Sequence, residues 1–152
     1  SFIEDLDSTS RDDYLHHCGE SIANIGNAGF LIELWQSIKW KVKFLQKNLD
    51  FNTSLGYMHI AMAFTENLHK QDLLFGSELY ADSLIIIATS YKNIPDSLGL
   101  AIYYEESALM VFRDLYEQDP DDLRDRYVDG LLNLSNSYFK DGRVEKSIDL
   151  SK

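Results

Sequence analysis

The sequence predicts an all-α fold of antiparallel helical hairpins, with about seven helices in a single domain over residues 1–152. Apolar residues recur at three- and four-residue intervals, which is the period of a helix, whereas a strand would alternate. Only 8 Gly and 2 Pro interrupt the chain, so long elements are expected. A set of identical residues also returns 47 positions later, and such a period indicates a repeated unit.

The repeat is visible in two successive shifts of the sequence. In the first shift the following residues return: Gly29, Ile38, Tyr57, Ala61, Leu68, Gln71 and Asp72, as Gly76, Ile85, Tyr104, Ala108, Leu115, Gln118 and Asp119. In the second shift the returning residues are Asp82, Leu84, Ser90 and Tyr91, as Asp129, Leu131, Ser137 and Tyr138. An aromatic residue therefore occupies one position in three units, at Phe44, Tyr91 and Tyr138.

The helices are predicted in chain order from their apolar stripes and from the residues that start and stop them. The expected ranges are 10–26, 29–49, 53–69, 72–93, 97–118, 121–140 and 143 to the C-terminus. Ser10, with Asp12 and Asp13 after it, is typical of a capping box that opens the first helix. The Gly and Asn residues of 24–29 predict the turn into the second helix.

The later helices have clearer start signals. Pro95, Asp96 and Ser97 mark the start of the fifth helix. Residues 119–122 place an N-cap acid, a proline at the first helical position and two carboxylates in the first turn, where unpaired N–H groups favour negative charge. Asp141, Gly142 and Arg143 predict a tight turn before the last helix.

The period fixes how the helices pair. The expected hairpin units are 29–69, 72–118 and 121–152, and the helix at 10–26 falls where the second helix of a preceding unit would lie. The array therefore is expected to start and stop within units, as a piece of a larger protein would.

The third unit, from Asp125 onward, resembles a tetratricopeptide repeat. The family's signature positions are occupied by Leu131, Leu134, Ser135, Tyr138, Gly142 and Ser147. The second unit matches the same pattern with Leu84, Ile87, Ala88, Tyr91, Ala101, Ala108 and Pro120. The unit is 47 residues rather than the family's 34, and the first unit departs further, with Lys41 where a small residue is expected.

Long-helix repeats of this kind are similar to those that accompany separase-type and CHAT caspase-fold proteases and nucleotide-dependent sensor proteins. The resemblance implies an α-α superhelix that serves as a scaffold or a regulatory, partner-reading segment of a larger assembly. It also implies that the first helix of each unit lines a concave groove. The residues expected there are Trp35, Ile38, Val42, Asp82, Ile85, Thr89, Lys92, Asp129, Leu132, Asn136, Phe139 and Lys140.

The composition of the chain indicates which classes of partner and which cellular compartment to expect. The formal net charge of -11 would repel phosphate backbones and anionic lipid over most of the surface, so nucleic acid and membrane are not expected as general partners. Cys18, as the single cysteine, permits no disulfide within the chain, and the first residues lack the order of a signal peptide. We therefore expect a cytoplasmic protein.

Catalytic and metal-binding motifs are missing from the sequence. Asp13 and His17 share a helix face next to Cys18, but a metal site needs three or four converging ligands. No nucleophile elbow, phosphate-binding loop or dinucleotide fingerprint is present. We expect no catalytic residue, metal or cofactor, and a small helical enzyme or metal protein around Cys18 is the least favoured of the alternatives.

A basic stripe of Lys39, Lys43 and Lys47 stands out on this acidic chain. It is interpreted either as a docking strip for an acidic peptide or acidic face of a partner, or as a solvated face opposite a core-facing Trp40 and Phe44.

The favoured function is a non-enzymatic protein–protein interaction module that binds a peptide or helix of a partner in its concave groove. The strongest contacts are expected at Ile85, Thr89, Asn136 and Phe139. The alternative is a structural spacer or a self-association module that stacks end to end.

Overall fold

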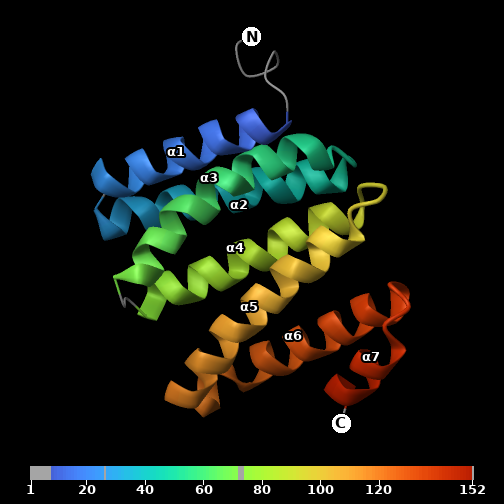
Figure 1. Cartoon of the computed structure of the whole chain (residues 1–152). Coiled ribbons are helices and arrows are strands. Elements are labelled where there is room, and N and C mark those ends of the chain that lie inside the picture. The colour runs from blue at the N-terminus through green and yellow to red at the C-terminus, as the bar shows by residue number, and fades with distance from the viewer. Residues whose placement is uncertain (1–7, 26, 72–73, 152) are drawn as a thin grey trace.

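The computed structural model describes residues 8–25, 27–71 and 74–151, and these ranges contain seven helices and no strand (Figure 1). The helices are α1 (Ser8–Ile25), α2 (Ala28–Lys47), α3 (Phe51–Lys70), α4 (Leu74–Lys92), α5 (Leu98–Gln118), α6 (Pro120–Lys140) and α7 (Val144–Ser151). The predicted all-α class and all seven helices are confirmed, and no boundary moves by more than two residues.

Most helix ends follow the predicted local signals. The Asp119 side chain accepts a hydrogen bond from the Asp122 N–H at 3.4 Å, and Pro120 is the first residue of α6. Gly142 closes the turn after α6 in a left-handed conformation, with φ 81°, which glycine adopts without steric cost. The capping box expected at Ser10 is wrong, because α1 begins at Ser8 and Ser10 lies inside the helix.

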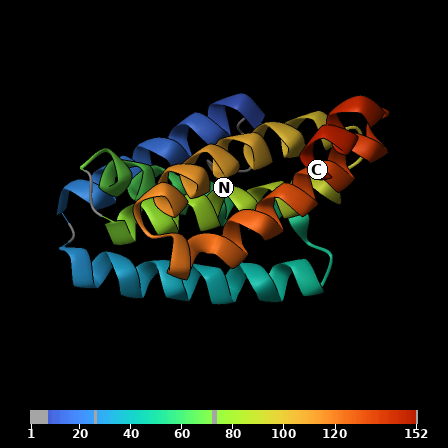
Figure 2. The same cartoon turned by 90° about the horizontal axis from the view of Figure 1, so that it is seen from below.

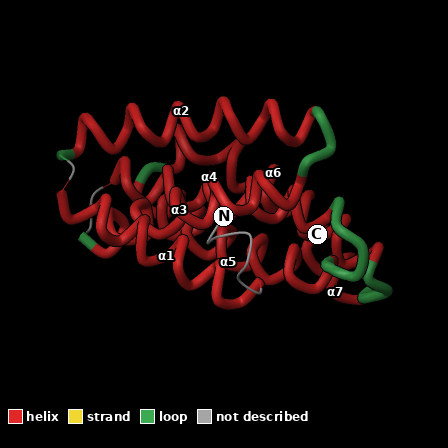
Figure 3. Tube along the Cα trace, turned by 90° about the horizontal axis from the view of Figure 1, so that it is seen from above, coloured by secondary structure: helices red, strands yellow, loops and turns green. Residues whose placement is uncertain are grey.

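Most helices pack on their neighbours along the chain. From α2 onward, every helix contacts the next one, while α1 packs on α3. Figure 2 shows α2 at one side of the molecule, set apart from the remaining helices, and Figure 3 shows the same arrangement from the opposite direction. α4 lies in the middle of this sequence of contacts, between α3 and α5.

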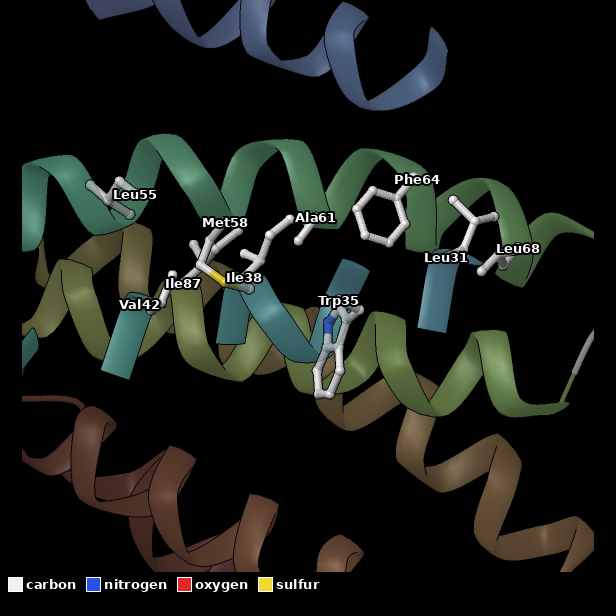
Figure 4. Close-up of a cluster of buried hydrophobic side chains, with 10 residues drawn as sticks. All are labelled: Leu31, Trp35, Ile38, Val42, Leu55, Met58, Ala61, Phe64, Leu68 and Ile87. Carbon is white, nitrogen blue, oxygen red and sulfur yellow. The ribbon is translucent and has the colours of Figure 1, made fainter. Parts of the chain in front are cut away.

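The core consists of clusters between neighbouring helices. The largest cluster joins α2, α3 and α4, and Figure 4 shows its side chains converging between these helices. A second cluster joins α4, α5 and the start of α6, and a third joins α5 and α6. α4 contributes buried residues to both larger clusters, with Ile87 in the first and Leu84 in the second. Both of the larger apolar clusters therefore depend on the position of α4.

Candidate functional site

The expected groove residues of α2 are buried in the core. Trp35 is 2% exposed, Val42 is 0% exposed, and Ile38 is also buried, in the cluster drawn in Figure 4. The predicted rotation of this helix is therefore wrong: these side chains hold α2 on α3 and α4 and do not line an open surface. The sequence does contain a signal for the observed rotation. Apolar residues alternate at four- and three-residue steps at Leu31, Trp35, Ile38, Val42 and Leu45, without a charge among them.

Two polar side chains fix α2 along one flank of α4. The indole Nε1 of Trp35 donates a hydrogen bond to Ser83 Oγ at 2.9 Å. Near the other end, Gln46 Nε2 donates to Ser90 Oγ at 3.0 Å. The indole N–H of Trp35 and the hydroxyl of Ser83 are both buried. Each gives the other a hydrogen-bond partner, and without that partner its removal from water would be costly.

The opposite flank of α4 is held to α6 by charge. The guanidinium of Arg126 forms an ion pair with Asp82 and a longer one with Glu78, at 3.5 Å. The same guanidinium lies over the ring of Phe112, 4.9 Å from its centroid. Burial lowers the pKa of Arg126, and Glu78 acts in the opposite direction. The part of α4 that carries Asp82, Ile85 and Thr89 therefore lies between α2 on one side and α6 on the other. We call this part the α4 strip.

This strip of α4 borders a surface pocket of about 220 Å³. Three of the expected groove residues meet there: Asp82 and Ile85 from α4 and Asp129 from α6. Arg126, Gly130 and Asn133 of α6 and Phe112 of α5 complete its lining. Thr89, one turn further along α4, is exposed. The sequence prediction missed Arg126 and Asn133, because the repeat register identifies positions on one helix and not the contacts between helices.

Two other expected groove residues meet at the C-terminal end of α4. Lys92 and Lys140 line a second pocket of about 500 Å³, together with the α4–α5 turn. Lys92 Nζ also forms an ion pair with Glu105, whose side chain is 2% exposed. Ser137 Oγ donates to the same carboxylate at 2.9 Å. The buried charge of Glu105 is thus compensated by a cation and a hydroxyl, which is a structural role.

The remaining expected groove residues lie on α6 outside both pockets. Asn136 is exposed, as are Leu132 (53%) and Phe139 (65%). These three side chains are accessible to a partner, but the structure does not bring them together with the α4 strip in one pocket.

The basic stripe of α2 lies on the side of the helix away from the core. Lys43 and Lys47 are exposed, whereas Lys39 is half-buried, with its Nζ 5.0 Å from the centroid of the Trp35 ring. The pKa of Lys39 is lowered, mainly by burial and then by the positive charges of Lys43 and Arg126. Lys39 therefore experiences the charge of α6 as well as that of its own helix.

The two aromatic residues beside this stripe do not face the core. Trp40 is 75% exposed and Phe44 is 60% exposed, so the expectation that they pack inward is wrong. Trp40 lines a pocket of about 210 Å³ on α2 with Gln36, Lys39 and Lys43. The physical reason is that Trp35 and Val42 already occupy the side of α2 that meets α3 and α4, and a helix cannot bury both stripes on one neighbour.

The cluster in α1 does not form a ligand set. His16 Nε2 and His17 Nδ1 both lie near the carboxylate of Glu20, at 3.1 and 3.6 Å. Asp13 is exposed and Cys18 is half-buried. Within the part of the chain that the structure describes, no group of three or more His, Cys, Asp or Glu side chains is placed to hold a metal ion.

Comparison with protein-family models, with curated proteins and with solved structures finds no match for this chain. None of the helices within the described ranges combines the length and the apolar content needed to cross a bilayer. In the described residues the structure is a seven-helix, all-α arrangement, with a half-buried α4 strip on which Thr89 is exposed and a basic, aromatic outer face on α2.

Proposed function

We propose that this chain is a protein-interaction module built from tetratricopeptide-like helical repeats, and that a partner segment binds across the α4 strip between α2 and α6. The observation that carries the proposal is the pocket bordered by Asp82, Ile85 and Asp129, which combines an apolar side chain with charged and amide groups. Such a mixture suits a peptide or helix that has an apolar anchor.

The contacts between α2, α4 and α6 support a repeated arrangement. Trp35 of α2 bonds to Ser83 of α4, and Glu78 of α4 bonds to Arg126 of α6; in both pairs the partners are 48 positions apart. This separation is close to the 47-residue period of the sequence. Stacked units that repeat their inter-unit contacts form the extended surfaces on which repeat proteins hold their partners.

Photo-crosslinking tests this proposal directly. A photoreactive amino acid placed at Thr89 or Asn136, both exposed, is expected to give discrete adducts with a partner in extracts of the source cells. The matched control is Met110, which is 60% exposed on α5. Adducts that form at Met110 as readily as at Thr89, or adducts at Thr89 that survive Ile85→Asp in a folded protein, would contradict the assignment of this face.

End-to-end self-association is the second candidate, because apolar side chains are exposed on the last two helices. The exposed residues are Val128 (43%), Leu132 (53%), Phe139 (65%) and Ile148 (51%). If stacking is the function, light scattering should show oligomers that grow with concentration and disappear in Leu132→Asp and Phe139→Asp. A protein that stays monomeric at all concentrations would contradict it.

A further inference from the structure

The outer face of α2 carries the most exposed tryptophan of the described residues. We define the α2 ridge as the residues Gln36, Lys39, Trp40, Lys43, Phe44 and Lys47. Trp40 and Phe44 are one helical turn apart, and both are more than half exposed. Single exposed apolar residues are ordinary on a protein surface, but an aromatic pair on one helix face beside a pocket is typical of an interaction site.

The ridge also has the opposite charge to the rest of the chain. Fourteen basic residues oppose twenty-five acidic ones overall, yet residues 34–49 contain four lysines and no carboxylate. The lysines are Lys39, Lys41, Lys43 and Lys47. Among the ion pairs of the described residues none involves these lysines, whereas Lys70, Lys92, Arg126 and Arg143 all have carboxylate partners. The positive charge of the ridge is therefore not compensated within the described part of the fold.

From this charge and this aromatic pair we infer that the α2 ridge docks an acidic, amphipathic segment of a partner protein, with carboxylates on the lysines and an apolar side chain against Trp40 and Phe44. This inference adds a second binding surface to the proposed interaction module, separate from the α4 strip, and names the chemistry of its partner. The pocket between Gln36, Lys39, Trp40 and Lys43 is the place for one anchoring side chain. A tryptophan in such a position contributes strongly to binding, because it buries a large rigid surface.

A short acidic segment fits the surroundings of the ridge better than a long polyanion does. On the side of α4 away from α2, Asp82 and Asp129 line the pocket next to α6, and Glu78 pairs with Arg126 there. The net charge of the whole chain is -11. An extended nucleic acid or a charged membrane would have to approach these carboxylates as well, while a helix that lies along α2 meets its lysines and one carboxylate, that of Glu33.

Binding of a designed peptide to the full chain tests the inference. The probe is a fluorescent amphipathic peptide of about 18 residues, or roughly five turns, with glutamates on one face and leucines on the other. Its control has lysine at every glutamate position. The acidic peptide is expected to bind about tenfold or more tightly than the basic one, and to weaken as salt is raised from about 0.1 to 0.5 M. Equal binding of the two peptides, or no binding, would overturn the inference.

Variants of the chain locate the site. Lys43→Glu with Lys47→Glu is expected to weaken the acidic peptide by about tenfold or more, and Trp40→Ala by a similar factor. The matched control is Arg124→Glu with Lys146→Glu, which makes the same charge change at exposed positions of α6 and α7 and should leave the affinity within about twofold. Circular dichroism verifies that each variant is folded. If the control pair weakens binding as much as the ridge pair, the attraction is general and the ridge is not the site.

Tryptophan emission provides a readout at the site itself. The chain has two tryptophans, and Trp35 is buried, so the acidic peptide should shift the emission of Trp40 to shorter wavelength. The shift should vanish in Trp40→Phe. Oligothymidylate or phosphatidylserine vesicles that bind as tightly as the peptide would overturn the choice of a protein partner.

The two proposals can fail separately. One outcome is that a partner forms adducts at Thr89 and Asn136 while the Lys43→Glu, Lys47→Glu variant binds the peptide as before. This outcome would contradict the ridge proposal and support the α4 strip. The opposite outcome is peptide binding that depends on Trp40, with no adducts at Thr89. It would support the ridge proposal and contradict the α4 strip.

Discussion

The two flanks of α4 are joined to their neighbours by different chemistry. On the side of α2 and α3 the contacts are apolar or neutral: Trp35 bonds to Ser83, and Ser54 bonds to Ser90 at 2.7 Å. On the side of α5 and α6 charged contacts accompany the apolar cluster: Lys92 and Ser137 meet the carboxylate of Glu105, and Arg126 pairs with Asp82 and Glu78.

The contrast is sharpest at Ser90 and Ser137, which lie 47 residues apart in the sequence. Both side chains are buried at a contact between helices. Ser90 meets another serine and Gln46, whereas Ser137 meets a buried carboxylate. A small hydroxyl thus lies where two helices approach at both positions, while the partner of that hydroxyl differs. The charged flank should consequently be the more sensitive to single substitutions.

The largest effect is expected for Lys92→Met. Methionine keeps an apolar stem but removes the ammonium group, so Glu105 remains in the core as an uncompensated charge. We expect a loss of about 3 kcal/mol in the free energy of unfolding, measured with urea. Adding Glu105→Gln should restore most of it, because a neutral amide still bonds with Ser137. A loss below about 0.5 kcal/mol would mean that water screens the pair and that the two flanks do not differ.

Two glycines that lie 47 residues apart, Gly76 and Gly29, test how closely the helices pack on the neutral flank. A Cβ at Gly76 of α4 would lie 2.6 Å from Leu68 Cβ and 2.9 Å from the Leu68 carbonyl carbon, so α3 and α4 would have to separate. Gly76→Ala should cost about 2 kcal/mol in urea unfolding. At Gly29, its repeat equivalent, the nearest such atom is Asn27 Oδ1 at 3.5 Å, and alanine should fit without loss. Equal effects at both positions would contradict this difference.

Trp35→Phe isolates the neutral hydrogen bond. Phenylalanine keeps a ring in the α2 core but removes the donor to Ser83, whose hydroxyl still donates to the Leu79 carbonyl at 2.8 Å. The expected loss is about 1 kcal/mol and should change little between low and high salt, because the lost hydrogen bond is neutral and phenylalanine keeps a ring near Lys39. A loss that varies with salt would show that the α2 flank also depends on charge.

A separate effect is a decline in stability at alkaline pH. Burial, followed by the hydrogen bond to Glu106, raises the pKa of Tyr138 from 10.0 to about 12, and burial, followed by Glu66, raises that of Tyr80 to about 12. The unfolded chain releases these protons first, so their stabilisation is complete below pH 10 and is lost between pH 10 and 12. Urea unfolding across this range should show the decline, and Tyr138→Phe should reduce it. An unaltered pH profile in that variant would contradict the assignment to Tyr138.

Much of the fold could be predicted because its signals are local. Asp119 and Pro120 start α6, Gly142 ends the turn after it, and the stripe of Ala101, Ala108 and Leu115 identifies the buried side of α5. Each of these features depends on residues within one or two turns of one another. Of the expected contact residues, Thr89 and Asn136 are exposed and Ile85 is half-buried, and their role in binding stays a prediction.

The sequence by itself determined the seven helices, some of their caps and the separation of a lysine segment from an acidic chain, because these depend on neighbouring residues and on composition. Only the tertiary structure decided which residues α2 contacts. The helix has two aromatic stripes, through Trp35 and through Trp40; its own pattern favours burial of the uncharged Trp35 stripe, and α3 and α4 supply the surface that this stripe packs on. The same holds for Lys92 and Glu105, whose pairing requires α4 and α5 to lie side by side.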